Sequence, residues 1–273
     1  MSAVVHAPSA LFDLVAHDLS RGTSDLPQLA RSAAEALRVA RATELDIDAA
    51  VKLAENDPPL AARVLAVANS ALYARGARHV SPRRAIAHIG GSAVREVLYQ
   101  SAYASMIVDV PRFAEEIARD FVHGVATAAL ARALARIASA DPEDAFLGGL
   151  LHDLGRARCW KIVARRLPSL GGDEHVHEIV DALHTSAGHA LVQTWQLPAE
   201  IAEVCLHHHE PGARRLPAVV AAANVLAHAA EGRPELRTPE EALAAIGIDA
   251  ELSPEWIARG KVEVERAQLM TRG

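Results

Sequence analysis

At five places in this chain, a residue that caps helices stands directly before a proline. These pairs are Asp57-Pro58, Ser81-Pro82, Asp141-Pro142, Thr238-Pro239 and Ser253-Pro254. The side-chain oxygen of the first residue satisfies free N–H groups of the first turn, and proline suits the first helical position because its φ is fixed and it lacks an N–H. Strands would instead need alternating β-branched or aromatic residues, and only 4% of this Ala- and Leu-rich chain is aromatic. The sequence therefore predicts an all-α fold.

The size and charge of the chain limit the kinds of partner that it can have. It has 273 residues, of which 51% are hydrophobic, so it can build one large domain or two ordinary ones. The formal net charge of -6 disfavours a broad surface for nucleic acid. The basic pairs Arg83-Arg84, Arg165-Arg166 and Arg214-Arg215 are far apart in sequence, and we interpret them as solvated helix ends. We expect no nucleic-acid partner.

The cysteines and the N-terminus indicate a cytoplasmic location. Cys159 and Cys205 show no CxxC spacing, which is typical of reduced thiols rather than a disulfide framework. Residues 1–19 lack the basic start and apolar core of a signal peptide, and no window approaches 18 uninterrupted apolar residues. We expect a soluble cytoplasmic protein with no membrane partner.

Prolines and glycines divide the chain into four predicted parts. Pro111 and the segment Gly232-Arg233-Pro234 mark two of the boundaries. The parts are an N-terminal extension (1–24), an N-terminal helical submodule (25–110), a His-rich helical submodule (111–231) and a C-terminal segment with two appended helices, at about 239–246 and 254–270 (232–273).

Apolar spacing predicts the helices of the N-terminal submodule. After Pro58, four apolar residues have the i, i+4, i+7, i+11 spacing of one buried helix face: Leu60, Val64, Val67 and Ala71. We expect this apolar face to be widened by Leu65, Ala68 and Leu72. The next predicted helix runs from Pro82 to about Ile89 and ends at Gly90-Gly91. Ser92 is the predicted cap of a further helix that continues to Met106.

An adjacent histidine and aspartate lie inside the apolar run Gly148–Arg156. Burying an imidazole beside a carboxylate is costly unless the two are paired or bound to a cation. His152 and Asp153 therefore indicate half of a metal site. The alternative is a core histidine that is hydrogen-bonded to a helix cap.

Further histidines are spaced so that several helices could bring them to the same place. The intervals are 29 residues from His123 to His152, 31 from Asp153 to His184 and 24 from His184 to His208, each long enough for a helix and its return. Several imidazoles with one carboxylate suit Fe, Mn, Zn or Ni more than Mg or Ca. Such a centre could activate water or polarise a phosphoryl oxygen, with Arg156 placed to hold a phosphate. We interpret four further histidines as surface residues: His175, His177, His189 and His228.

The chain resembles the HDOD domain, a helical output domain related to the HD and HD-GYP phosphohydrolases, from about Leu26 to Arg215. In the first half, the resemblance depends on Leu26–Leu29, Asn56–Leu65, Ala68–Tyr73 and Ala85–Gly90. In the second half, it depends on Ala145–Arg156, His184–Gly188, Trp195–Pro198 and His208-His209. It implies an N-terminal helical module packed on an HD-like helical bundle, in a bacterial signalling protein whose HDOD module binds partners and whose hydrolytic activity is generally not established.

The resemblance also assigns metal-ligand positions. The positions are His123, His152, Asp153, His184, His208 and His209, and the last position of the hydrolases, an Asp, is Asn224 here. The amide removes one negative charge and should weaken retention of a dinuclear centre. The Gly-Tyr-Pro segment that accompanies cyclic di-GMP hydrolysis is missing after Glu210, and Arg156 replaces the usual Lys. Hydrolysis of cyclic di-GMP is therefore not expected.

Three functions follow as hypotheses. The favoured one is a non-catalytic regulatory module that binds a signalling protein and retains a metal in the HD-like site. The second is a metal-dependent phosphohydrolase for a nucleotide or phosphoester, in which Asp153 and Arg156 take part in catalysis. The third is a sensor that binds a small nucleotide without hydrolysing it. No organic cofactor is predicted.

Overall fold

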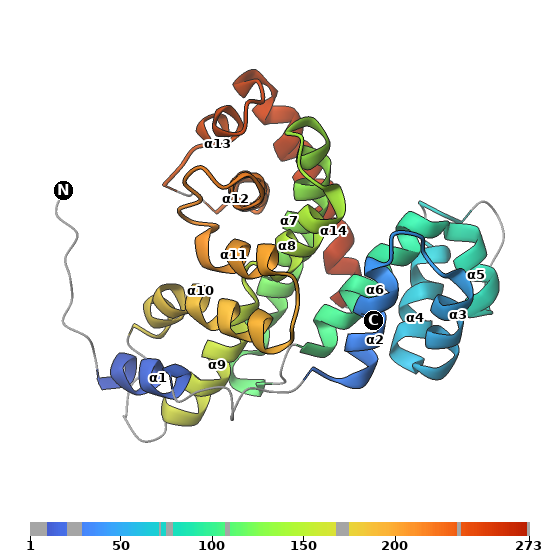
Figure 1. Cartoon of the computed structure of the whole chain (residues 1–273), viewed down its shortest axis with the longest axis horizontal. Helices are drawn as coiled ribbons and strands as arrows, with labels where there is room; N and C mark the ends of the chain where they lie inside the picture. The colour runs from blue at the N-terminus through green and yellow to red at the C-terminus, as the bar shows by residue number, and fades with distance from the viewer. Residues whose placement is uncertain are drawn as a thin grey trace. The chain divides into compact units, whose positions relative to one another are not determined.

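The structure is a computed structural model, and it describes residues 10–20, 29–70, 72–74, 79–106, 110–167, 175–233 and 236–271 (Figure 1). Over these residues the chain is helical and contains no strand. The prediction of an all-α fold is confirmed. Among the helices that the structure describes, none is both long and apolar enough to cross a lipid bilayer.

The contacts within the chain divide it into two compact units, one of residues 28–107 and one that combines residues 1–27 with 108–273. These units are groups of contacts and not separately folding parts, so the division into four parts stays a prediction. We describe each unit separately.

In the part of residues 28–107 that the structure describes, there are five helices. They are α2 (Arg31–Arg41), α3 (Ile47–Asn56), α4 (Pro58–Ala68), α5 (Pro82–Ile89) and α6 (Gly91–Met106). Helix α6 packs on α2 and α4, while α5 packs on α3 and α4. The core of this unit contains Leu37, Val51, Leu60, Ile86 and Leu98, each at most 3% exposed.

Predicted caps begin the helices of this unit. The carboxylate of Asp57 accepts a hydrogen bond of 3.0 Å from the N–H of Leu60 and so caps α4. Helix α5 begins at the predicted Pro82, although the side chain of Ser81 makes no capping bond. Gly90 ends α5 with a φ of 81°, a conformation that favours glycine, and α6 starts one residue before the predicted cap Ser92.

The end of α4 differs from the prediction, because the helix stops at Ala68. Leu60, Val64, Val67 and Ala68 are buried as expected, but Leu72 lies beyond the helix and is 69% exposed. The prediction that Leu72 widens the buried stripe is therefore wrong, and Ala71 lies outside the described residues. The helix ends here because the side-chain amide of Asn69 binds the backbone of His79. Its Oδ1 accepts a hydrogen bond of 2.7 Å from the His79 N–H, and its Nδ2 donates one of 2.8 Å to the His79 carbonyl.

The second unit contains the His-rich helices. Its elements are α1 (Ala10–Ser20), the 3-10 turn η2 (Pro111–Phe113), α7 (Ala114–Ile137), α8 (Pro142–Leu151), α9 (Leu154–Arg166), α10 (Val176–Thr194), α11 (Ala199–His207), α12 (Arg215–Ala230), α13 (Pro239–Ala245), the 3-10 turn η4 (Ala250–Leu252) and α14 (Ser253–Thr271). The predicted cap-proline pairs precede or begin α8, α13 and α14.

Helix α7 is the central element of this unit. Helices α8, α12 and α14 pack against it, as Figure 1 shows. Its middle is buried on all sides through residues such as Phe121, Val125, Leu130 and Leu134, which is typical of a helix inside a core. The C-terminal helix α14 approaches closely at Gly260, where an added Cβ would lie 2.9 Å from the Cβ of Ala230.

The first testable prediction concerns Asn69. In the full chain, Asn69→Ala should lower the free energy of unfolding by about 1–3 kcal/mol, since it removes both side-chain partners of the His79 backbone. Unfolding in urea, followed by circular dichroism, measures the change. Ser70→Ala is the control, because the Ser70 hydroxyl bonds only the nearby carbonyl of Val67, and it should cost less. Equal costs for the two variants would contradict the role of Asn69.

Candidate metal centre

The sequence-predicted ligands come from five places in the second unit. His123 lies on α7, His152 and Asp153 form the turn between α8 and α9, and His184 lies on α10. His208 and His209 follow the end of α11, where the sequence predicted them, and Asn224 lies on α12. The fold brings all of these side chains together, although they are spread over about 100 residues.

Asp153 is the centre of the group. Its Oδ1 lies 3.3 Å from Nε2 of His184 and 3.4 Å from Nε2 of His208, and its Oδ2 lies 3.5 Å from Nε2 of His152. The residue is 8% exposed, while His152 is fully buried. Three imidazoles thus present the same ring nitrogen to one buried carboxylate.

Backbone carbonyls fix the orientation of these three rings. Nδ1 of His152 donates to the carbonyl of Gly149 at 2.8 Å, and Nδ1 of His184 donates to that of Asp181 at 2.7 Å. Nδ1 of His208 donates to the carbonyl of Cys205 at 3.1 Å. A carbonyl oxygen can only accept, so each Nδ1 carries the proton. In the neutral ring, Nε2 is then left with a lone pair that faces Asp153, which is the arrangement of metal-binding histidines.

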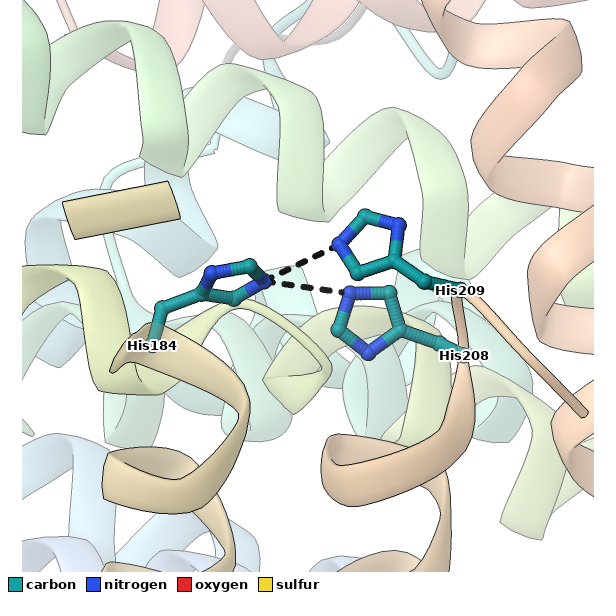
Figure 2. A group of neighbouring side chains, drawn as sticks. All are labelled: His184, His208 and His209. Carbon is teal, nitrogen blue, oxygen red and sulfur yellow. Dashed lines mark hydrogen bonds between the residues drawn. The ribbon is translucent and has the colours of Figure 1, made fainter. Parts of the chain in front are cut away.

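The lone pairs need a shared cation. Figure 2 shows the ring of His184 facing His208 and His209, with Nε2–Nε2 distances of 3.4 Å and 3.1 Å. Nε2 of His152 and Oδ1 of Asp153 are buried and have no hydrogen-bond partner among the residues that the structure describes. Acceptors that face one another without a donor are costly to bury, and a bound metal ion relieves this cost. The donor set therefore fits a transition metal.

The burial of the site keeps the ligands in their binding forms. Burial lowers the pKa of His152 to about 3 and that of His209 to about 4, and it also lowers the pKa of His184. Burial alone would raise the pKa of Asp153, but the neighbouring His152 and His184 hold it well below its usual value. Near pH 7, the imidazoles of His152, His184 and His209 are therefore neutral and the carboxylate of Asp153 is ionised, as metal binding requires.

His123 stands at the edge of this group and has other partners. One of its ring nitrogens lies within 4.8 Å of ligand atoms of His152 and Asp153. Its Nε2 donates to Oδ1 of Asn224 at 2.7 Å, and its Nδ1 lies 3.2 Å from Oε1 of Glu231. Burial alone would lower the pKa of His123, but the hydrogen bond to Glu231 and its charge raise it.

Arg156, the predicted phosphate-binding residue, is engaged by two carboxylates. Its Nε donates to Asp120 at 3.0 Å and its Nη1 to Asp181 at 2.6 Å. Asp120 also accepts a hydrogen bond of 3.0 Å from the indole N–H of Trp160. The guanidinium therefore lines the site with most of its charge already balanced.

The group opens into a polar cleft of about 540 Å³. Arg119 and Arg233 line it together with Arg156. Four carboxylates line the same cleft and balance the charge of these three guanidinium groups: Glu116, Asp120, Asp153 and Asp181.

Two residues that line or adjoin this cleft were not predicted from the sequence to belong to it. His228 is not a surface residue as predicted: its side chain is 15% exposed, and its ring stacks on that of His123 with centroids 4.2 Å apart. Glu231 is 12% exposed and contacts the same ring. The spacing of Asn224, His228 and Glu231 along one helix face could have indicated them. Of the other three predicted surface histidines, His175 and His177 are exposed, whereas His189 is half-buried and donates to the carbonyl of Ala202.

Close packing of α9 on α10 holds Asp153 beside His184. A Cβ added to Gly155 would lie 1.9 Å from the carbonyl oxygen of His184 and 2.4 Å from the N atom of Gly188. The atoms that a Cβ would meet belong to the backbone and cannot move aside as a flexible side chain would. Only glycine therefore fits at this contact.

The second prediction tests this contact. Gly155→Ala should separate α9 from α10, lower the free energy of unfolding by about 1–3 kcal/mol and reduce the amount of Zn²⁺ that the full chain takes up. Gly188→Ala is the matched control, because its Cβ would meet the Gly155 N atom only at 3.2 Å, and it should have a smaller effect on both quantities. Urea unfolding and elemental analysis measure the two effects. Normal stability in Gly155→Ala would show that the contact does not position the site.

Comparisons with known proteins agree with this fold. The family model of the HDOD domain matches residues 26–211, which is more than half of the chain. Among curated proteins, none matches the chain.

Solved structures of similar fold cover nearly the whole chain. A "Putative metal-dependent phosphohydrolase" from Shewanella amazonensis SB2B has a TM-score of 0.71 and 18% identity, over 94% of this chain and 97% of that one. An "HDOD domain protein with unknown function" from Geobacter sulfurreducens has a TM-score of 0.68 and 20% identity, over 94% and 96%. A "Putative signal transduction protein" from Marinobacter aquaeolei VT8 also has a TM-score of 0.68 and 20% identity, over 99% of this chain and 68% of that one. At these identities the likeness concerns the fold, and with the family match it leads to one conclusion: the chain belongs to the HDOD domain family.

Proposed function

We propose that this chain is a regulatory HDOD module that binds a signalling protein and retains a transition metal ion at the centre formed by His152, Asp153, His184, His208 and His209. The observation that carries the proposal is the convergence of three unprotonated Nε2 atoms on the buried carboxylate of Asp153. Imidazoles with one carboxylate suit Fe, Mn, Zn or Ni. When bound, such an ion would supply a Lewis acid in the cleft.

Two features favour regulation over hydrolysis. Asn224 stands where the hydrolases have a carboxylate, and its Oδ1 is already hydrogen-bonded to His123. Arg156 is held by Asp120 and Asp181, so its charge is less available to a phosphate in the transition state. The name of the structurally similar Marinobacter protein also supports a signalling role.

The cleft supports one alternative function. Its three arginines and its volume of about 540 Å³ would accommodate a phosphoester or nucleotide next to the metal. The similar Shewanella protein bears the name of a metal-dependent phosphohydrolase. In that case, Asp153 would hold the metal and Arg156 would orient the phosphate.

The third prediction concerns the metal. The full chain, purified without chelator and without a His-tag, should contain about one or more Fe, Mn, Zn or Ni ions. The double variant His184→Gln, His208→Gln should contain less metal than the wild type, by about one ion per chain, since it removes two of the converging nitrogens. Elemental analysis of the purified proteins measures the content.

His207→Gln provides the matched control, because His207 is adjacent in sequence but contacts Glu203 on its own helix. It should keep the wild-type metal content. Metal-free wild-type protein, or equal metal in the wild type and the double variant, would contradict a metal centre at these residues.

The fourth prediction distinguishes regulation from hydrolysis. The metal-loaded chain should release no phosphate or nitrophenol from a panel of phosphomonoesters, phosphodiesters and nucleotides, whereas affinity capture should repeatedly return one protein partner. Turnover that disappears in Asp153→Asn and persists in His207→Gln would replace the regulatory function by hydrolysis. A rise in melting temperature with one nucleotide, without any product, would instead indicate a nucleotide sensor.

A further inference from the structure

Beyond Asn224, helix α12 and its C-cap residue carry two more metal-ligand types on the same face. His228 and Glu231 follow at i+4 and i+7, so the three side chains lie one above the other along the helix. Helix α12 packs against α7, and this face is turned to His123. The pair His228 and Glu231 has the i, i+3 spacing by which helices in bundles present two ligands to one metal ion.

The distances in this group are those of a slightly open metal site. Nδ1 of His123 lies 3.2 Å from Oε1 of Glu231, and Nδ1 of His228 lies 3.8 Å from its Oε2. One ligand atom from each residue lies within 4.8 Å of the other two. Around a tetrahedral ion with bonds of about 2.0–2.2 Å, ligand atoms lie roughly 3.3–3.6 Å apart. The rings of His123 and His228 are stacked with 25° between their planes, so both rings must tilt for their nitrogens to converge on one ion.

Asn224 orients His123 for this purpose. The Oδ1 atom of Asn224 can only accept, so at 2.7 Å it fixes the proton of His123 on Nε2. The other nitrogen, Nδ1, is then the one that faces Glu231. It donates to this carboxylate while the ring is protonated, and a metal ion would bind there by displacing that proton. A hydrogen bond to the remote nitrogen is the usual support of a metal-binding histidine. The amide at this position thus suits an ion on the α12 side of the ring.

We propose that His123, His228 and Glu231 form a second metal site, for a divalent first-row transition ion, at the contact between α7 and α12. Two imidazoles and one carboxylate are the ligands of catalytic zinc sites and of non-heme Fe(II) sites. All three side chains are at most 15% exposed, so the ion would be shielded from bulk water on most sides. The site shares only His123 with the predicted ligands of the first centre, so the two proposals can fail separately.

Arg233 competes with the metal ion for Glu231. Its Nε and Nη2 both donate to Oε2 of the carboxylate, with the Nε bond at 2.7 Å. Its side chain is 45% exposed and can swing away into solvent. Removing this positive charge should strengthen metal binding, because an ion and a guanidinium cannot both occupy the same carboxylate oxygen.

The fifth prediction tests the site in the full chain. Relative to the wild type, His228→Gln, Glu231→Gln should lose about one equivalent of Zn²⁺ per chain after desalting, or bind it at least about tenfold more weakly. Elemental analysis and calorimetric titration with Zn²⁺ measure these changes. With Co²⁺ as the probe, the variant should lose one part of the visible absorption of the wild-type complex.

The matched control is His175→Gln, Glu178→Gln. This pair has the same chemistry and the same i, i+3 spacing, with a distance of 3.1 Å, but it is exposed on α10. It should keep the full Zn²⁺ content. A wild-type Zn²⁺ content in His228→Gln, Glu231→Gln would overturn the second site.

Arg233→Gln keeps the proposal testable if the double variant does not fold. It changes only an exposed side chain, and it should bind Zn²⁺ more tightly than the wild type by severalfold. An unchanged or weaker affinity would count against the site.

A comparison of the two double variants distinguishes the two centres. Metal that His184→Gln, His208→Gln retains and His228→Gln, Glu231→Gln loses belongs to the α12 site. If only His184→Gln, His208→Gln loses metal, the chain has the first centre alone.

Discussion

The buried carboxylate of Asp153 is the group around which the second unit is organised. A single buried charge costs several kcal/mol unless opposite charges or hydrogen-bond donors surround it. Here the nearest atoms are Nε2 of three histidines, and their protons are held on the far nitrogens by backbone carbonyls. The turn between α8 and α9, the middle of α10 and the end of α11 thus place nitrogen lone pairs rather than donors around Asp153.

This arrangement connects packing to chemistry. Gly155 lets α9 touch α10, and the contact fixes the distance from Asp153 to His184. Gly149 plays a related part on α8: a Cβ there would lie 2.8 Å from Cα of Ala128 on α7, and its carbonyl orients His152. Small residues at helix contacts therefore do more than fill space, because they set the positions of the ligands that lie two or three residues from them in the chain.

Much of the fold could be predicted from the sequence, because helix starts are local. A cap oxygen and a proline act within one turn, and the predicted starts of α4, α5, α8 and α13 are found in the structure. The end of α4 could not be predicted in the same way, since it depends on Asn69 reaching His79 ten residues away. His228 was misjudged for the same reason, because its burial arises only when α12 packs on α7.

The candidate site could be predicted in part. The spacing of the histidines indicated several converging helices, and the structure brings the predicted side chains together, whereas their binding of a metal stays a prediction. The engagement of Arg156 could not be predicted. Asp120 and Asp181 lie 36 and 25 residues away in the sequence, and nothing near Arg156 in the chain indicates that they approach it.

The distribution of negative charge explains how one chain could hold ions at two neighbouring places. The first centre has one carboxylate, Asp153, among several imidazoles, and one carboxylate is little charge to retain two divalent ions side by side. Asn224 adds none. Glu231, the C-cap residue of α12, places a second carboxylate on the other side of His123 and supplies there the negative charge that Asn224 lacks. An ion beside Glu231 would be stabilised by the carboxylate of Glu231 and would not depend on the charge of Asp153.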